Sequence, residues 1–145
     1  MALTKVDQRV VTTLVAQYTA AGGQSISNNT YTKVQYDTVS FDPNSIWSTA
    51  NDRFTATIAG VYRVGGAVGF QGGGGAWNGS LYVYKNGSAY LPLCQITPSQ
   101  MDLLSGNCLV QLAVGDYVEI FVRQQSGVSQ TVETISYVEI EQVSG

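Results

Sequence analysis

The sequence predicts an all-β fold, a sandwich or jelly roll of two antiparallel sheets built from about eight to ten short strands. Three observations support this class. The 9 Tyr residues and the many Thr and Val residues favour strands, and 16 Gly residues divide the chain into short segments. Apolar residues nowhere recur at helical spacing over three turns. Several segments instead alternate apolar and polar residues, so one side of each strand can enter a core.

The expected strands follow one another along the chain. They cover residues 10–18, 30–37, 53–58, 61–70, 81–84, 89–91, 108–112, 117–123 and 134–140. In each strand, alternation selects one inward-facing set. The clearest sets are Phe54, Ala56 and Ile58; Tyr62, Val64, Val68 and Phe70; Cys108, Val110 and Leu112; and Val118, Ile120 and Val122. Glu119 and Arg123 alternate with the last set and are expected to face water.

Turn residues separate these strands. Asn86 and Gly87 are the pair that best supplies two positive φ angles, which predicts a hairpin with a type I′ turn. Gly60 lies between two expected strands, where a tight turn would use its freedom to adopt positive φ. Gly115 and Asp116 form the turn that opens the strand at 117–123.

Composition excludes several functional classes. The chain has 145 residues, 44% hydrophobic and 12% charged, which suits one domain with one core. Its net charge of −3 argues against a nucleic-acid partner. His is absent, which excludes Ser-His-Asp and Cys-His nucleophiles and His-ligated metals. We therefore expect no enzyme activity, no catalytic residue and no cofactor.

No membrane partner is expected. No segment approaches the roughly 20 apolar residues that span a bilayer, and the first residues lack the apolar region of a secretory signal. The protein is therefore expected to be made and kept in the cytosol.

Acidic residues suggest no metal or catalytic site. Glu139 and Glu141 share one face of the last strand, where a solvated surface explains them better than an acid–base pair. Asp42, Asn44 and Asp52 resemble ordinary turn residues more than a calcium loop, so no metal is assigned.

The cysteines and the glycine run also favour structural roles. Cys94 and Cys108 have no metal-ligand or redox-motif spacing, and two reduced, buried thiols are favoured over a disulfide. The four glycines at 72–75 are not followed by the Lys of a phosphate loop, so they predict a flexible connection.

Two tryptophans are the candidate ligand residues. Trp47 and Trp77 lie in or beside loops, where an exposed ring would give a sugar an apolar surface to stack on. The alternative, which we favour, is that each ring caps one end of the core, because Trp is usually buried.

The order of motifs along the chain resembles the complement C1q-like domains of the C1q/TNF superfamily. Residues 54–62 (FTATIAGVY) resemble the family signature F-T-A-P-x-A-G-x-Y. Residues 81–87 (LYVYKNG) are similar to its L-x-K-N-G hairpin, and residues 112–118 (LAVGDYV) to its L-x-x-G-D-x-V. The last strand departs from the family ending F-S-G-F-L-I, with Tyr137 in place of Gly and Glu139 in place of an apolar residue. The collinear order is more specific than any single motif.

The resemblance implies a ten-stranded jelly roll at residues 10–145, preceded by an arm at 1–9, and a homotrimer formed around one sheet. Large apolar residues on the second face of a sheet mark an interface. The residues expected at the trimer contact are Leu109, Gln111, Ile135 and Tyr137.

Residues 25–39 (SISNNTYTKVQYDTV) are similar to the lead-in of C1q-like domains from bacteriophage structural proteins. The primary hypothesis is therefore a non-enzymatic, homotrimeric virion protein, a capsid decoration or cement protein on the capsid surface. About eight residues precede the first expected strand, which suits a short arm that plugs into a shell. The arm residues expected to contact the major capsid protein or another virion protein are Leu3, Lys5, Val6 and Arg9.

Two alternatives remain open. The first is a receptor-binding head domain of a tail fibre or spike, which would recognise a glycan or surface protein through Trp47, Trp77 and the glycine loop. The second is a C1q-like bacterial surface protein encoded by a prophage.

Overall fold

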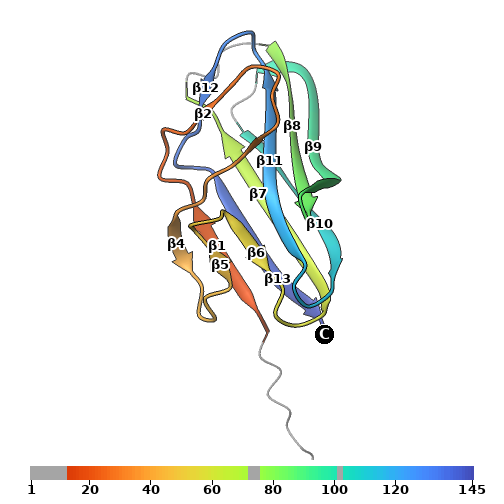
Figure 1. Ribbon diagram of the computed structural model, residues 1–145. Coiled ribbons are helices and arrows are strands. Elements are labelled where there is room, and N and C mark those ends of the chain that lie inside the picture. The colour runs from red at the N-terminus through yellow and green to blue at the C-terminus, as the bar shows by residue number, and fades with distance from the viewer. Residues whose placement is uncertain (1–12, 72–75, 101–102) are drawn as a thin grey trace, which may run out of the picture.

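The fold is all-β, as predicted. The computed structural model describes residues 13–71, 76–100 and 103–145, and within these it contains 13 strands and no helix (Figure 1). The strands are β1 (Val15–Thr19), β2 (Ser25–Ile26), β3 (Thr32–Lys33), β4 (Thr38–Phe41), β5 (Trp47–Ser48), β6 (Arg53–Thr55), β7 (Gly60–Gly69), β8 (Ala76–Lys85), β9 (Ser88–Gln100), β10 (Leu103–Leu112), β11 (Tyr117–Gln125), β12 (Gln130–Thr131) and β13 (Tyr137–Ser144). None of the described residues forms a helix that could cross a membrane.

Two antiparallel sheets make up the sandwich. One has five strands in the order β10-β7-β13-β1-β4. The other has six, with the path β5-β6-β11-β8-β9 and β3 paired to β11 beyond β6. A short β12–β2 pair lies at one end. Neighbours such as β7 and β13 are far apart in sequence, which is typical of a jelly roll.

The core lies between the sheets and uses most of the predicted inward positions. Tyr62, Val64, Val110 and Val122 are fully buried, because strict alternation sends them to the same side of their strands. Two predicted positions differ: Cys108 is only half-buried, and Ile58 has 43% of its surface exposed. Strand β6 ends at Thr55, so the alternation that would carry Ile58 inward has already stopped.

The Asn86–Gly87 turn is confirmed. Both residues have positive φ, 51° and 79°, as a type I′ turn requires. The prediction for Gly60 is wrong: it begins β7 and is not among the residues with positive φ. A Cβ at Gly60 would lie 2.0 Å from the backbone oxygen of Ser144, so glycine is needed here for close approach of two strands.

The segment at 30–37 is less regular than predicted. Only Thr32 and Lys33 join a ladder, although Val34 and Tyr36 beyond them are fully buried. This places Lys33 beside β11, where its Nζ lies 3.1 Å from Glu119 Oε1. Glu119 is buried, not exposed as the alternation predicted, and its carboxylate is paired with Lys33 of the adjacent strand.

Both ends of the described chain lie at one end of the sandwich (Figure 1). The amide of Gln142 donates to the carbonyl of Leu14 at 2.8 Å, which joins the start of β1 to the end of β13. At the opposite end, fully buried Gln124 donates to the carbonyls of Ile26 and Val128 and so holds the loop after β11. The opposite end therefore holds neither end of the described part of the chain.

Candidate functional site

The outer face of the five-stranded sheet holds most of the residues predicted for a trimer contact. Leu109 and Gln111 are exposed on β10, and half-buried Tyr137 lies on the same face of β13. Ile135 is also exposed but precedes β13. Leu109 and Tyr137 pair with Arg63 and Ala67 of β7, about 13 Å apart along the strand. Their part in a trimer contact stays a prediction.

Large apolar side chains are exposed at both edges of this sheet. Leu103 and Leu109 lie on the β10 edge, and Val39 and Phe41 on the β4 edge. All four are more than 40% exposed. Two apolar edges on opposite sides of one sheet suit a contact in which one edge of a subunit meets the other edge of its neighbour.

Charged residues occupy the middle of the same face. Arg63 Nη1 lies 2.7 Å from Glu141 Oε2, and both side chains are about half exposed. Glu139 lies over Gly65, where an added Cβ would come within 2.7 Å of Oε1. With Val15 and Phe41 these residues border a hollow of about 280 Å³. The glutamates thus belong to a sheet surface, consistent with the structural interpretation of the sequence.

Both tryptophans lie in the core and are almost fully buried. Trp47 is 7% exposed, packs near Tyr18 and Tyr36, and donates from Nε1 to the carbonyl of Tyr36 at 3.1 Å. Trp77 is 5% exposed and makes an edge contact with Phe70. This burial favours the interpretation that each ring caps the core, and it leaves little ring surface on which a sugar could stack.

Other predicted sites are structural or lie outside the described residues. Asp42 accepts hydrogen bonds from the amides of Ile46 and Trp47 and from the Tyr18 hydroxyl, which is turn chemistry. Among the described residues no group of three or more His, Cys, Asp or Glu side chains could hold a metal. The arm residues Leu3, Lys5, Val6 and Arg9 and the glycines at 72–75 fall outside the described ranges.

The cysteines are free thiols, both half-buried against the core. Burial raises the pKa of the Cys108 thiol, so it is a weaker nucleophile than an exposed cysteine at neutral pH. This fits the preferred prediction of two reduced cysteines.

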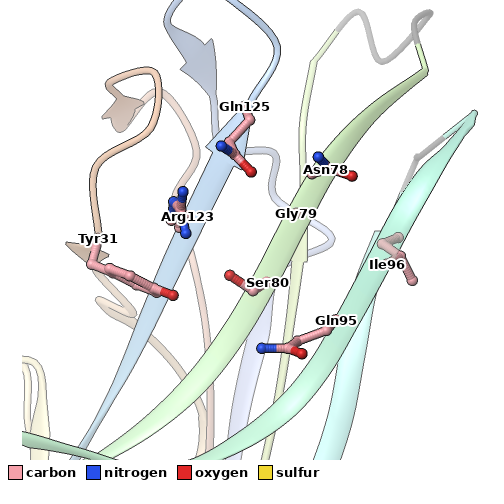
Figure 2. A pocket seen from close by; sticks show the side chains of 8 residues that line it. All are labelled: Tyr31, Asn78, Gly79, Ser80, Gln95, Ile96, Arg123 and Gln125. Carbon is pink, nitrogen blue, oxygen red and sulfur yellow. The ribbon is translucent and has the colours of Figure 1, made fainter.

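A polar pocket that the sequence did not predict lies on the outer face of the six-stranded sheet (Figure 2). Its volume is about 340 Å³. It is lined by Tyr31, Asn78, Gly79, Ser80, Gln95, Ile96, Arg123 and Gln125. These residues come from the loop before β3 and from β8, β9 and β11. Figure 2 shows the Tyr31 ring reaching across β11 toward Ser80, with Arg123 and Gln125 beside it.

Asn29 holds two of the residues that line this pocket, Arg123 and Gln125. Its Oδ1 accepts hydrogen bonds from Arg123 Nε at 2.9 Å, from Arg123 Nη2, and from Gln125 Nε2 at 3.1 Å. Its backbone has a φ of 54°, a conformation that Asn adopts more readily than most residues. The Arg123 guanidinium carbon lies 5.4 Å from the centroid of the Tyr31 ring, within cation–π range.

The pocket carries a positive charge, which Arg123 supplies. Burial raises the pKa of Tyr31, but hydrogen bonds with Arg123 and Ser80 outweigh burial and leave that pKa lowered. Within the described ranges Arg123 has no carboxylate partner. Alternation alone predicted only that Arg123 faces solvent; the pairing with Asn29, 94 residues away, depends on the fold.

The C1q domain family profile matches residues 17–138. Among characterised sequences, the chain is similar to the Phage-like element PBSX protein XkdV of Bacillus subtilis (strain 168), with 32% identity over 110 residues. The match covers 70% of this chain and 16% of XkdV, so the chain spans about a sixth of that relative.

Solved structures show the same fold. Murine APRIL superposes with a TM-score of 0.63 at 11% identity, covering 90% of this chain and 99% of APRIL. The globular domain of zebrafish complement 1qA protein gives a TM-score of 0.55 at 16% identity, covering 89% and 94%. The jelly-roll topology predicted from the order of motifs is thereby confirmed.

Proposed function

This chain belongs to the C1q domain family, and from that premise we propose that it is a non-enzymatic, homotrimeric structural protein of a phage-derived particle. The observation that carries the proposal is the exposed apolar surface at both edges of the five-stranded sheet, in a chain similar to a phage-like element protein. C1q/TNF-like domains are generally homotrimeric and non-enzymatic.

The distribution of apolar residues supports a ring of three subunits. A contact between unlike patches closes into a ring when the rotation between neighbours is a whole fraction of a turn. Leu103 and Leu109 on one edge, and Val39 and Phe41 on the other, supply the two unlike patches. The hollow beside Phe41 could accommodate an apolar side chain from the neighbouring subunit.

The first placement is the capsid surface, where the trimer would act as a decoration protein. Three weak contacts made together hold more firmly than one, so a trimer can staple neighbouring capsid subunits. In this placement the arm at 1–9, with Leu3, Lys5, Val6 and Arg9, contacts the major capsid protein.

The second placement is the head domain of a tail fibre or spike, and two observations favour it. The matching segment makes up 16% of XkdV, so a related domain there is one part of a longer chain. The start of β1 and the end of β13 also lie together, which leaves the opposite end free to meet a receptor. Binding of the purified protein to undecorated capsids would favour the first placement; immunolabelling confined to the tail would favour the second.

Native mass of the purified protein tests the assembly. We expect a species of three 15.5 kDa subunits. Leu109→Asp should weaken trimer formation by at least about a hundredfold, because a carboxylate would be buried without a partner. Val128→Asp is the matched control, since Val128 is 61% exposed in the loop after β11, away from that face. A monomeric wild-type protein, or a Leu109→Asp variant that remains trimeric, contradicts the proposal.

A further inference from the structure

We propose that the pocket shown in Figure 2 binds an acidic saccharide, a hydroxyl-rich sugar ring that carries a carboxylate or a phosphate group. The receptor-binding placement above would make use of such a site, but the chemistry of the pocket does not depend on where the protein lies in a particle. Purified protein is therefore sufficient to test it.

The charge of the pocket selects an anion. Arg123 brings a guanidinium into the pocket, and none of the lining residues is acidic. A charge-assisted hydrogen bond to a carboxylate or phosphate is about twice as strong as a neutral one. Hydrogen bonds with Arg123 and Ser80 also lower the pKa of the Tyr31 hydroxyl, so these groups favour a negative charge beside them.

The guanidinium is held in place before any ligand arrives. Oδ1 of Asn29 accepts hydrogen bonds from both Nε and Nη2 of Arg123, which fixes the plane of the guanidinium. The same oxygen accepts from Gln125. A preorganised side chain loses less conformational freedom on binding, so more of its interaction energy appears as affinity.

The remaining lining groups suit a sugar ring. Asn78, Ser80, Gln95 and Gln125 supply amide and hydroxyl groups that can donate to or accept from sugar hydroxyls. Tyr31, 39% exposed, offers an aromatic surface on which the apolar face of a ring can pack. Few convergent polar groups around an aromatic wall are typical of small-ligand sites.

Irregular strand pairing supports a built site. The β8–β9 ladder shifts register between Trp77 and Gly79, so Asn78 lies opposite the extra residue of a bulge in β9. Bulges redirect side chains and are over-represented beside binding sites. The pocket also lies on the sheet opposite the proposed trimer face, so three copies would remain accessible in a trimer and bind multivalent glycans with avidity.

Calorimetric titration of the full-length protein tests the proposal with matched pairs of sugars. Sialyllactose against lactose tests the carboxylate, and glucose 6-phosphate against glucose tests the phosphate. We expect at least one acidic member to bind about tenfold more tightly than its neutral counterpart, and added salt to weaken that binding. Equal binding of the acidic and neutral members, or no binding of either acidic sugar at millimolar concentration, overturns the proposal.

Substitutions locate the site. Arg123→Gln should lower the affinity for the acidic sugar about tenfold. Asn29→Asp keeps the acceptor oxygen and tolerates positive φ, but its carboxylate would neutralise Arg123, so binding should be lost without loss of fold. Arg53→Gln is the matched control, because Arg53 also lies over a tyrosine, Tyr117 at 4.4 Å, but outside this pocket. An Asn29→Asp variant that binds like wild type, or an Arg53→Gln variant as weak as Arg123→Gln, overturns the assignment.

Discussion

The outer faces of the two sheets differ in how their large apolar and aromatic side chains are packed. On the six-stranded sheet, aromatic rings contact one another: Tyr84 stacks on Phe121 at 3.8 Å, and Tyr31 meets Tyr82 edge-on at 5.6 Å. On the five-stranded sheet, Leu109 is 54% exposed, and Leu103 and Phe41 are exposed as well. On the first face the aromatic rings cover part of one another, although Tyr31 stays 39% exposed, whereas the leucines on the β10 edge of the second face are about half exposed.

This difference fits the two proposed tasks, assembly through the five-stranded sheet and ligand binding on the six-stranded sheet. A sheet whose aromatic groups already stack within one subunit gains little by covering them with a neighbour, so it can remain in solvent and carry a ligand pocket. A sheet with exposed apolar edges is stabilised when another surface removes them from water, at about 25 cal/mol per Å² of apolar area. The ion pairs follow the same division: Lys33–Glu119 is partly buried, while Arg63–Glu141 is open.

Removing an aromatic ring from the six-stranded face should have the largest effect on the stability of the single subunit. Phe121→Ala is expected to lower the free energy of unfolding by about 2 kcal/mol, less than for a fully buried Phe because Phe121 is only half-buried. Denaturant unfolding in the Leu109→Asp background measures this without a contribution from assembly.

Leu103→Ala on the other face is the matched comparison. Leu103 is 42% exposed, so its truncation should change the subunit stability by no more than about 0.5 kcal/mol in the same background. If both variants lose the same stability, the two faces are equally self-contained and the comparison fails.

Removing the cation of the covered ion pair should have a smaller effect. Lys33→Met leaves the buried carboxylate of Glu119 without its cation and is expected to cost about 1 kcal/mol, because the lysine side chain is 35% exposed and partly screened. Arg63→Met, in a pair whose side chains are 47% and 50% exposed, should cost at most about 0.3 kcal/mol. Chemical denaturation of both variants in the monomeric background decides between them; a larger loss for Arg63→Met would reverse the assignment of the faces.

The sequence predicted those features that depend on neighbours along the chain. Alternation placed Tyr62, Val64 and Val110 in the core, and the Asn86–Gly87 pair defined a hairpin, because strand and turn preferences act over a few residues. The order of motifs gave the jelly roll, which no single segment could specify.

The sequence did not predict features that depend on contacts between distant segments. Glu119 has the alternation of a solvent-facing residue, but it is buried in the fold, where Lys33 of the neighbouring strand β3 pairs with it. The pocket depends on Asn29 meeting Arg123 across 94 residues, and no periodicity encodes that contact. The role of Gly60 was predicted wrongly for the same reason. A Cβ at this position would clash with the backbone of Ser144, and that residue is far away in the sequence.

The smallest expected effect concerns the turn that leads into β11, in the six-stranded sheet, and the pKa of Asp116 within it. Asp116 accepts hydrogen bonds from Asn86 Nδ2 at 2.9 Å and from the Ala113 amide at 3.0 Å, and its carboxylate lies 3.1 Å from Lys85 Nζ. These contacts lower the pKa of Asp116 to about 2, the Asn86 hydrogen bond contributing most.

A pH titration of this turn sharpens the comparison further. Because the folded-state pKa of Asp116 lies below its ordinary value of 3.8, its contribution to stability is present above that value and is lost as the pH falls toward 2. Asn86→Gly keeps the positive φ of the turn and removes the strongest donor, so NMR titration of the carboxyl carbon should show the pKa of Asp116 rising toward 3.8. An unchanged pKa would mean that Lys85 and the Ala113 amide hold the carboxylate without Asn86. The order of these contacts would then need revision, although the division between the two faces would stand, because it rests on packing and not on this turn.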